Sequence, residues 1–145
     1  MTTIQIRQAI AEEIGWINER YDEVGFVHSD LTRDYVAIAE VDRSRAGLGR
    51  LVQIDQAIAE LGGIFVVPEF RRQGLAASIV RFLIGQSGTC STIYCLPFAH
   101  LSGFYESFGF AACQRSPFIP EEVRNKHAWC NRHYPQPTLL FVLRR

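Results

Sequence analysis

The stretch GGIFVVPEFRRQGLAASIVRFLI, residues 62–84, decides the fold. Its first part is rich in residues that favour strands, and Pro68 ends the strand because proline has no N–H to donate. After Pro68 the apolar residues recur at helical spacing, which places Leu75, Ile79 and Leu83 on one face. The stretch therefore predicts a strand, then a glycine-bearing turn, then a helix with a buried face.

The turn before this helix has the features of an anion site. The first N–H groups of a helix have no partner inside it, and the helix dipole adds positive potential there. Gly74 lets a ligand approach the main chain, Ala76 keeps a nearby position small, and Arg71 and Arg72 add positive charge. These features favour a phosphate-bearing ligand. A solvated helix cap is the alternative, since neither GxxxxGK[ST] nor GxGxxG is present.

Outward from this stretch, strands and helices alternate along the chain. The connection Asp55-Gln56 is typical of a hairpin, and Gly62-Gly63 inside a strand indicates a bulge or a close backbone approach. A polar turn is expected at 43–47. The pattern predicts a mixed α/β fold with strands near 4–6, 35–40, 48–54, 57–67, 89–96, 110–113 and 138–143, and helices near 10–24, 75–85, 100–108 and 120–134.

Length and charge exclude several classes of protein. At roughly 150 residues per domain, the chain predicts a single domain, 1–145. Fifteen Lys and Arg balance fifteen Asp and Glu, so broad binding to nucleic acid or an anionic membrane is not expected. No apolar run approaches the roughly 20 residues that span a bilayer. The first residues lack the pattern of an export signal, so we expect a cytoplasmic protein.

The cysteines and histidines predict no metal cofactor. His127, Cys130 and His133 recur every three residues, a spacing that drifts around a helix, so a three-ligand site there is the weaker interpretation. The cysteines show no CxxC spacing and lie in apolar stretches. Reduced, mostly buried thiols are therefore expected at Cys90, Cys95, Cys113 and Cys130.

Two motifs, VPEFRRQGLA at 67–76 and GFYESFGF at 103–110, carry a family resemblance. The first resembles motif A of the GNAT superfamily of acyl-CoA-dependent N-acetyltransferases, Q/R-x-x-G-x-G/A, filled here by Arg71, Gly74 and Ala76. The second resembles motif B, in which a tyrosine follows an aromatic residue and precedes a Gly-Phe pair. The order of elements also agrees along nearly the whole chain. The resemblance implies a mostly antiparallel sheet, splayed between its fourth and fifth strands, that binds acetyl-CoA.

The resemblance also implies where the coenzyme binds. Its pantothenyl arm would pair like a strand with residues 65–67, namely Phe65, Val66 and Val67. Its pyrophosphate would lie on backbone amides of the turn and the first helical residues, Arg71, Arg72, Gln73, Gly74, Leu75, Ala76 and Ala77. The sequence departs from the family at Phe98, where an Asn is usual, and at Leu101, where a small Ala is common. Coenzyme contacts on that side, including those to the 3′-phosphate, therefore stay open.

Acetyl transfer to an amine needs a proton acceptor, donors for an oxyanion and a proton donor for the departing thiolate. By resemblance, Tyr105 is the general acid; the alternative is a tyrosine of the aromatic core. Glu60, eleven residues before Arg71, matches a general base that often acts through water, and a solvated strand residue is its alternative. His28, in the loop after the first helix, is an expected contact with the acceptor or a base, and a solvated loop histidine is its alternative. Trp129, on the last helix, is the other expected contact with the acceptor, and a helix that faces a dimer partner is the alternative there.

The favoured function is transfer of an acetyl group from acetyl-CoA to the primary amine of a small molecule, by direct attack in a ternary complex. Two alternatives stay open: a protein Nα or lysine acetyltransferase, and a non-catalytic sensor that binds acyl-CoA. The family often forms pairs, so a homodimer is compatible with the resemblance. No motif identifies the acceptor amine or the physiological acyl group.

Overall fold

The computed structural model describes residues 2–145, which fall into two compact units. Unit 1 runs to Val52 and resumes over Gly63–Gly88, and unit 2 comprises Gln53–Gly62 and Thr89–Arg145. The expectation of one domain over 1–145 stays a prediction.

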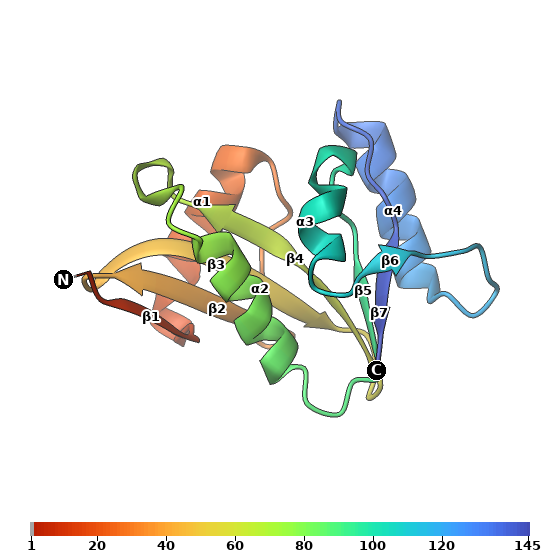
Figure 1. Cartoon of the computed structure of the whole chain (residues 1–145), viewed down its shortest axis with the longest axis horizontal. Coiled ribbons are helices and arrows are strands. Elements are labelled where there is room, and N and C mark those ends of the chain that lie inside the picture. Colours follow the sequence, from red (N-terminus) through yellow and green to blue (C-terminus); the bar gives the residue numbers. More distant parts are fainter. Residues whose placement is uncertain (1) are drawn as a thin grey trace. The chain divides into compact units, whose positions relative to one another are not determined.

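Seven strands form a sheet in the order β1-β2-β3-β4-β5-β7-β6 (Figure 1). Neighbouring strands pair antiparallel in the ladders β1–β2, β2–β3, β5–β7 and β6–β7, whereas β4 and β5 pair parallel. The predicted mixed fold, with a mostly antiparallel seven-stranded sheet and four α-helices, is confirmed. The strands are β1 (Ile4–Gln8), β2 (Asp34–Val41), β3 (Ser44–Gln53), β4 (Ile58–Val66), β5 (Thr92–Cys95), β6 (Ala111–Ala112) and β7 (Phe141–Arg144).

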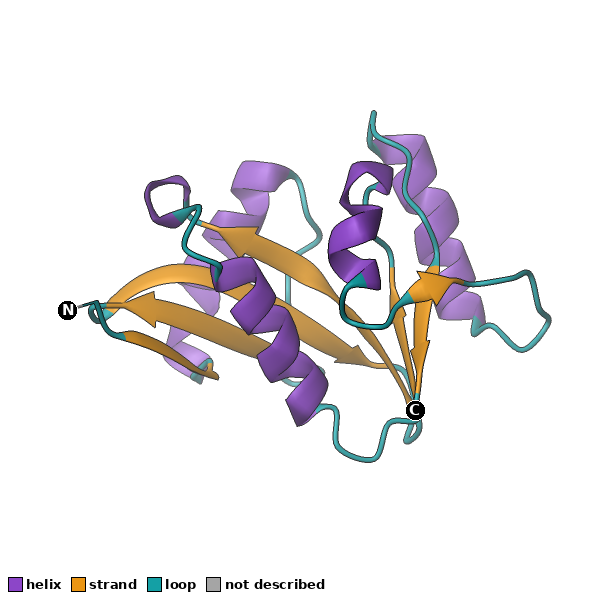
Figure 2. Cartoon of the chain, viewed as in Figure 1, coloured by secondary structure: helices purple, strands orange, loops and turns teal. Residues whose placement is uncertain are grey.

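Unit 1 packs one helix on each face of its strands. On one face, α1 (Ile14–Val24) packs Tyr21 into a cluster that includes Leu48 of β3. The next residue, Gly49, faces α2 (Leu75–Gln86), where a Cβ would lie 2.7 Å from Ile79 Cγ2. Alternation along β3 therefore sends successive residues to different helices. Figure 2 shows α2 in front of these strands and α1 behind them.

The turn between β2 and β3 is tighter than the sequence predicts. Polar composition indicates a turn over 43–47, but β3 already begins at Ser44 and pairs with Val41. The turn consists of Asp42 and Arg43, whose φ angles are 49° and 71°. A two-residue turn with both φ angles positive matches the twist of the flanking strands. Strand pairing thus extends through residues that composition alone assigns to a turn.

β4 contains the irregularity that Gly62-Gly63 predicts. Gly63 has a φ of 62°, in the left-handed region, and its carbonyl accepts a hydrogen bond of 2.9 Å from the Tyr21 hydroxyl. A Cβ at Gly63 would lie 2.5 Å from that hydroxyl oxygen, so glycine is required for both space and conformation. The ladder between β4 and β5 ends at the pair Leu61–Cys95, before this irregularity, although β4 continues to Val66.

Unit 2 builds its core around β5 and β7. Helix α4 (Glu121–His133) packs Val123 against Tyr94 of β5 and Val142 of β7. Between β5 and β6, the 3-10 helix η3 (Ala99–Leu101) leads into the short helix α3 (Ser102–Glu106). No helix in the described part of the chain has both the length and the apolar character needed to cross a membrane.

Candidate active site

The turn between β4 and α2 presents main-chain donors that lack protein acceptors. After the 3-10 helix η2 (Pro68–Phe70), Arg72 and Gly74 adopt left-handed conformations with φ of 68° and 76°. Within residues 2–145, no protein group accepts from the amides of 72–77, and Ser78 is the first to donate, to Gly74 O at 3.2 Å. Unpaired N–H groups at the start of a twelve-residue helix favour an anion there.

The amide of Arg71, which was predicted to bind the pyrophosphate, already has a protein acceptor. Its amide donates to Pro68 O at 3.3 Å, so it does not belong to the unpaired donors. Its Nε donates to Val66 O at 3.0 Å, and its guanidinium lies 5.7 Å from the centroid of the Phe65 ring. The pyrophosphate prediction therefore narrows to the amides of 72–77, with Arg71 supplying charge and local packing.

The main chain at the end of β4 favours one of the three residues that were predicted to pair with the pantothenyl arm. The Val67 amide donates to Ala46 O of β3 at 2.8 Å, so it faces the neighbouring strand. Because successive residues of a strand direct their polar groups to opposite sides, those of Val66 point away from β3. The Phe65 side chain lies in the core packed around α1. Of the three predicted residues, Val66 is thus the one whose main chain is directed away from β3.

Glu60 is buried and forms an ion pair that the sequence analysis missed. Its side chain is 5% exposed, and its Oε2 accepts a hydrogen bond of 2.7 Å from Lys126 Nζ of α4. The signal lay in helical spacing, because Lys126 follows the buried Val123 by three residues and precedes the buried Cys130 by four. The alternative of a solvated strand glutamate is wrong, since the carboxylate lies inside unit 2.

Tyr105 lies on α3 within an aromatic cluster. Its ring meets Phe104 edge to face at 4.9 Å and Phe110 at 6.1 Å. Burial raises the pKa of the Tyr105 hydroxyl well above its ordinary value, and the neighbouring Cys95 adds to this. No partner for the hydroxyl is found among residues 2–145. Tyr105 is therefore both a core residue and a protonated hydroxyl that is available to donate.

Two buried thiols of unit 2, Cys95 and Cys130, are poor nucleophiles. Burial raises the pKa of Cys95 well above its ordinary value, and the charge of Glu60 acts in the same direction while Lys126 opposes it. Burial also raises the pKa of Cys130. Because the thiolate is the reactive form, neither thiol is suited to carry an acyl group at neutral pH. All four cysteines of the chain are free thiols.

The two residues predicted to contact the acceptor lie in different settings. His28 is exposed in the loop after α1, where its Nε2 lies 2.6 Å from Asp22 Oδ1. Trp129 lies on α4, stacks on His133 with ring centroids 4.1 Å apart, and meets Tyr134 edge to face at 5.5 Å. Their roles as acceptor contacts stay predictions.

The histidines of α4 are engaged with the main chain. His127 Nε2 lies 2.8 Å from Thr138 O, and His133 Nδ1 lies 2.8 Å from Trp129 O. Within residues 2–145, no three His, Cys, Asp or Glu side chains are grouped so as to hold a metal ion.

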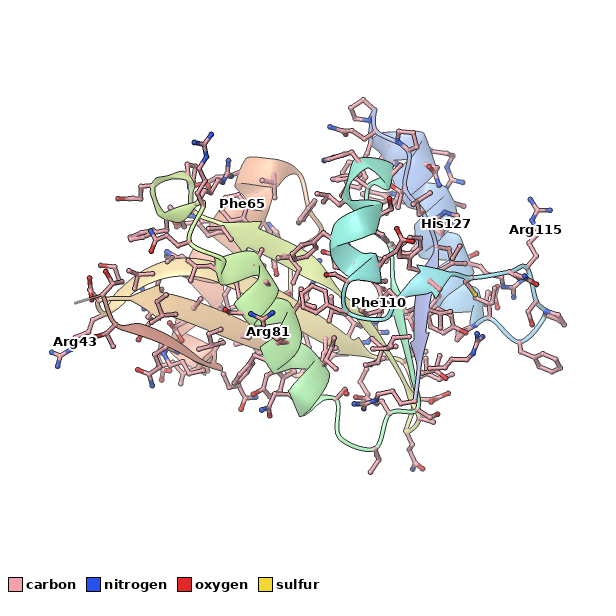
Figure 3. All side chains as sticks on the ribbon, in the orientation of Figure 1. Arg43, Phe65, Arg81, Phe110, Arg115 and His127 are labelled. Atoms are coloured by element: carbon pink, nitrogen blue, oxygen red, sulfur yellow. The ribbon has the colours of Figure 1, made fainter. Side chains whose placement is uncertain are left out.

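Unit 2 also contains a cavity of about 850 Å³, which His127 helps to line. It is lined by the loop before α4, by one side of α4 and by the residues that lead into β7, including Cys113, Arg124 and Phe141. In Figure 3, Arg115 extends outward from that loop, whereas His127 lies on the helix. None of the predicted catalytic or coenzyme-binding residues lines the cavity.

Comparison with solved structures shows the same fold in several acetyltransferases. N-acetylglutamate synthase from Neisseria gonorrhoeae, complexed with coenzyme A and N-acetyl-glutamate, matches with a TM-score of 0.75 and 20% identity. The match covers 98% of this chain but 35% of the synthase, so the chain spans about a third of that protein's length. The ribosomal-protein-S18-alanine N-acetyltransferase from Escherichia coli matches with a TM-score of 0.72 and 17% identity, over 98% of this chain and 94% of that one.

A third structure, a GNAT family acetyltransferase from Elizabethkingia anophelis with acetyl-CoA bound, matches with a TM-score of 0.68 and 15% identity, over 98% of both chains. No curated protein matches the sequence. The family model described as acetyltransferase (GNAT) domain matches residues 32–112, more than half of the chain, and these residues include both the α2 turn and Tyr105. The chain belongs to the GNAT acetyltransferase family.

Proposed function

We propose that the protein transfers an acetyl group from acetyl-CoA to the primary amine of a small molecule, by direct attack in a ternary complex. The observation that carries the proposal is the series of unpaired amides at 72–77, at the start of α2. Such donors fit a pyrophosphate, because several N–H groups and the helix dipole act on one anion. Solved structures of the same fold contain coenzyme A or acetyl-CoA, which supports this assignment.

The reaction forms an N–C bond and breaks the C–S bond of the thioester. The attacking amine must give up a proton, and the thiolate that leaves must gain one. We assign the first proton to Glu60, directly or through water, by way of Oε1, since Lys126 occupies Oε2. We assign the second to Tyr105, whose raised pKa keeps it protonated at neutral pH.

Direct attack is favoured over a covalent acyl-enzyme. The buried thiols Cys95 and Cys130 have raised pKa values, so they supply little thiolate at neutral pH. A ternary complex needs no enzyme nucleophile. Four free thiols also fit a reducing compartment, so we place the reaction in the cytoplasm.

The test of the proposal is a charge introduced at Gly74. In Gly74→Glu a carboxylate competes for the donors proposed to hold the pyrophosphate, so affinity for acetyl-CoA measured by calorimetry should fall by about 100-fold or more. Gly74→Ala shares the backbone strain at φ 76° without the charge. Gly85→Glu adds the same charge to the exposed last turn of α2, where no atom meets a Cβ.

Both controls should keep measurable binding. If Gly74→Glu binds acetyl-CoA as the wild type does, the site is wrong. If the wild type binds acetyl-CoA but acetylates no amine, small or peptidic, the protein is a sensor. Acetylation of peptides alone would move the acceptor to the protein class.

A further inference from the structure

Arg50 of β3 is a buried cation without a carboxylate partner. The residue is 5% exposed, and within residues 2–145 no Asp or Glu lies within ion-pair distance of it. Two other arginines of the unit 1 strands differ, because Arg7 and Arg45 both bind the carboxylate of Glu13, at 2.7 Å. A buried charge costs several kcal/mol unless it is paired. Arg50 therefore lacks a counter-charge that its burial calls for.

The contacts of Arg50 hold its guanidinium in place but leave one edge uncommitted. Nη1 donates to Val27 O at 2.9 Å and to Ser29 Oγ at 2.7 Å, both in the loop after α1. The guanidinium lies 4.4 Å from the centroid of the Tyr21 ring, whose face stabilises a cation. Among the described residues 2–145, the buried Nε finds no acceptor and Nη2 makes no hydrogen bond.

Gly63 of β4 lies beside this edge. A Cβ at Gly63 would lie 3.0 Å from Arg50 Nε, so glycine keeps a side chain of β4 off this donor. Nε and Nη2 of an arginine form two parallel donors, which match the two oxygens of a carboxylate. The uncommitted edge thus has the geometry of a carboxylate site.

Two charged groups of the neighbouring strand and loop have partners of their own. Asp34 of β2 lies two residues before Val36, the residue paired with Arg50, so it shares a face with Arg50; its Oδ2 accepts from the Asp30 amide at 3.2 Å. His28, in the loop that Arg50 holds, lies 2.6 Å from Asp22. Neither carboxylate reaches the guanidinium, so the missing anion has to come from a ligand.

We infer that Arg50 binds a carboxylate on the acceptor, so that the acceptor is an amine that also carries a carboxylate, as an amino acid does. The inference rests on the proposed function for the amine and on Arg50 itself for the carboxylate. The loop after α1 positions the guanidinium through Val27 and Ser29. Tyr21 contacts both Arg50 and Gly63: its ring lies against the Arg50 guanidinium, and its hydroxyl donates a hydrogen bond to the Gly63 carbonyl.

The test compares free amino acids with the amines that remain when their carboxylate is removed. For each pair, kcat/KM is measured with acetyl-CoA for the wild type, Arg50→Met and Arg50→Lys. The wild type should prefer the amino acid, and Arg50→Met should lower kcat/KM for it by about 100-fold and for the decarboxylated amine by far less. Arg50→Lys keeps the charge but lacks the two parallel donors of arginine. Its kcat/KM for the amino acid should therefore lie between those of the wild type and Arg50→Met.

Arg43→Met is the matched control, because Arg43 extends from the tip of the β2–β3 turn (Figure 3) and should alter neither substrate. Thermal unfolding establishes that each variant is folded. If Arg50→Met does not fold, Arg50→Lys, which keeps the charge, is compared with the wild type in its place. Equal kcat/KM for amino acid and amine in the wild type would overturn the inference and leave the proposed acetyl transfer intact.

A second readout separates the two proposals if no amine is acetylated. Calorimetry with the same amino acids measures binding without turnover, and the expected result is binding by the wild type that Arg50→Met loses. That outcome would support the carboxylate site while the proposed function fails. Absence of any amino acid binding to the wild type would overturn the carboxylate site.

Discussion

The chemistry at the residue scale depends on where protons are held. Tyr105 is enclosed by Phe104 and Phe110, and its raised pKa keeps the hydroxyl protonated. Glu60 is buried too, but its carboxyl group accepts a hydrogen bond from Lys126 at 2.7 Å. The two residues therefore differ in the way that a proton donor and a proton acceptor need to differ.

Replacing Tyr105 by Phe removes the donor and keeps the aromatic packing. We expect kcat to fall by about 100-fold, within the usual range for loss of a general acid, with little change in acetyl-CoA affinity. Steady-state kinetics and calorimetry measure the two effects. Tyr35→Phe, which removes another partly buried hydroxyl with a raised pKa, should leave kcat unchanged. An undiminished kcat in Tyr105→Phe would reduce Tyr105 to a core residue.

Replacing Glu60 by Gln removes the proton acceptor but leaves an oxygen that Lys126 can still contact. We expect kcat/KM for the amine to fall by roughly 100-fold, because the amide is too weakly basic to take a proton. Rates with a series of amines of differing basicity provide the check, and the loss should be largest for amines that are mostly protonated at the assay pH. Unaltered rates, with lowered thermal stability, would instead make Glu60 a structural partner of Lys126.

At the scale of elements, the buried carboxylate of Glu13 links strands β1 and β3 of unit 1. Glu13, in the 3-10 helix η1 (Ala11–Glu13), accepts from Arg7 of β1 at 2.7 and 2.9 Å, from Arg45 of β3 at 2.7 Å and from the Ile10 amide at 3.0 Å. The hydrogen bonds from Arg7 are the main reason that the pKa of Glu13 is lowered to about 2.

This lowered pKa predicts a pH dependence of stability. An ordinary glutamate titrates near 4.5, so the stabilisation by Glu13 is complete above that pH and is lost as the pH falls toward 2. In urea unfolding, the difference in free energy between the wild type and Glu13→Gln should shrink by on the order of 3 kcal/mol between pH 6 and pH 2. Glu19→Gln, which removes an exposed carboxylate, should show no such trend. A difference that is constant with pH would contradict the role of the network.

Local sequence patterns predict the elements well where one pattern acts alone. The period change after Pro68 locates α2, and Gly63 does adopt the irregular conformation expected of it. Prediction is poorer where pairing with another strand determines the structure. Composition assigns Ser44 to a turn, but its pairing with β2 makes it part of a strand. The ion pair of Lys126 and the lack of one at Arg50 could not be predicted for the same reason. Both depend on residues that come together only after folding.

On the scale of the whole molecule, the residues of the proposed reaction are distributed over two units of the chain. The α2 turn, Val66 and Arg50 belong to unit 1, whereas Glu60, Tyr105 and Lys126 belong to unit 2. The GNAT family match spans residues of both units. A test of acetyl transfer therefore uses the complete chain.

The most direct test of acetyl transfer is a product analysis on the complete chain. Purified protein is incubated with acetyl-CoA and a panel of small amines, and mass spectrometry quantifies free coenzyme A and N-acetylated amine in the same reaction. We expect equal amounts of the two products with the wild type and with Gly85→Glu, and neither product above background with Gly74→Glu. Release of coenzyme A with no acetylated amine, or no reaction despite bound acetyl-CoA, would contradict this expectation.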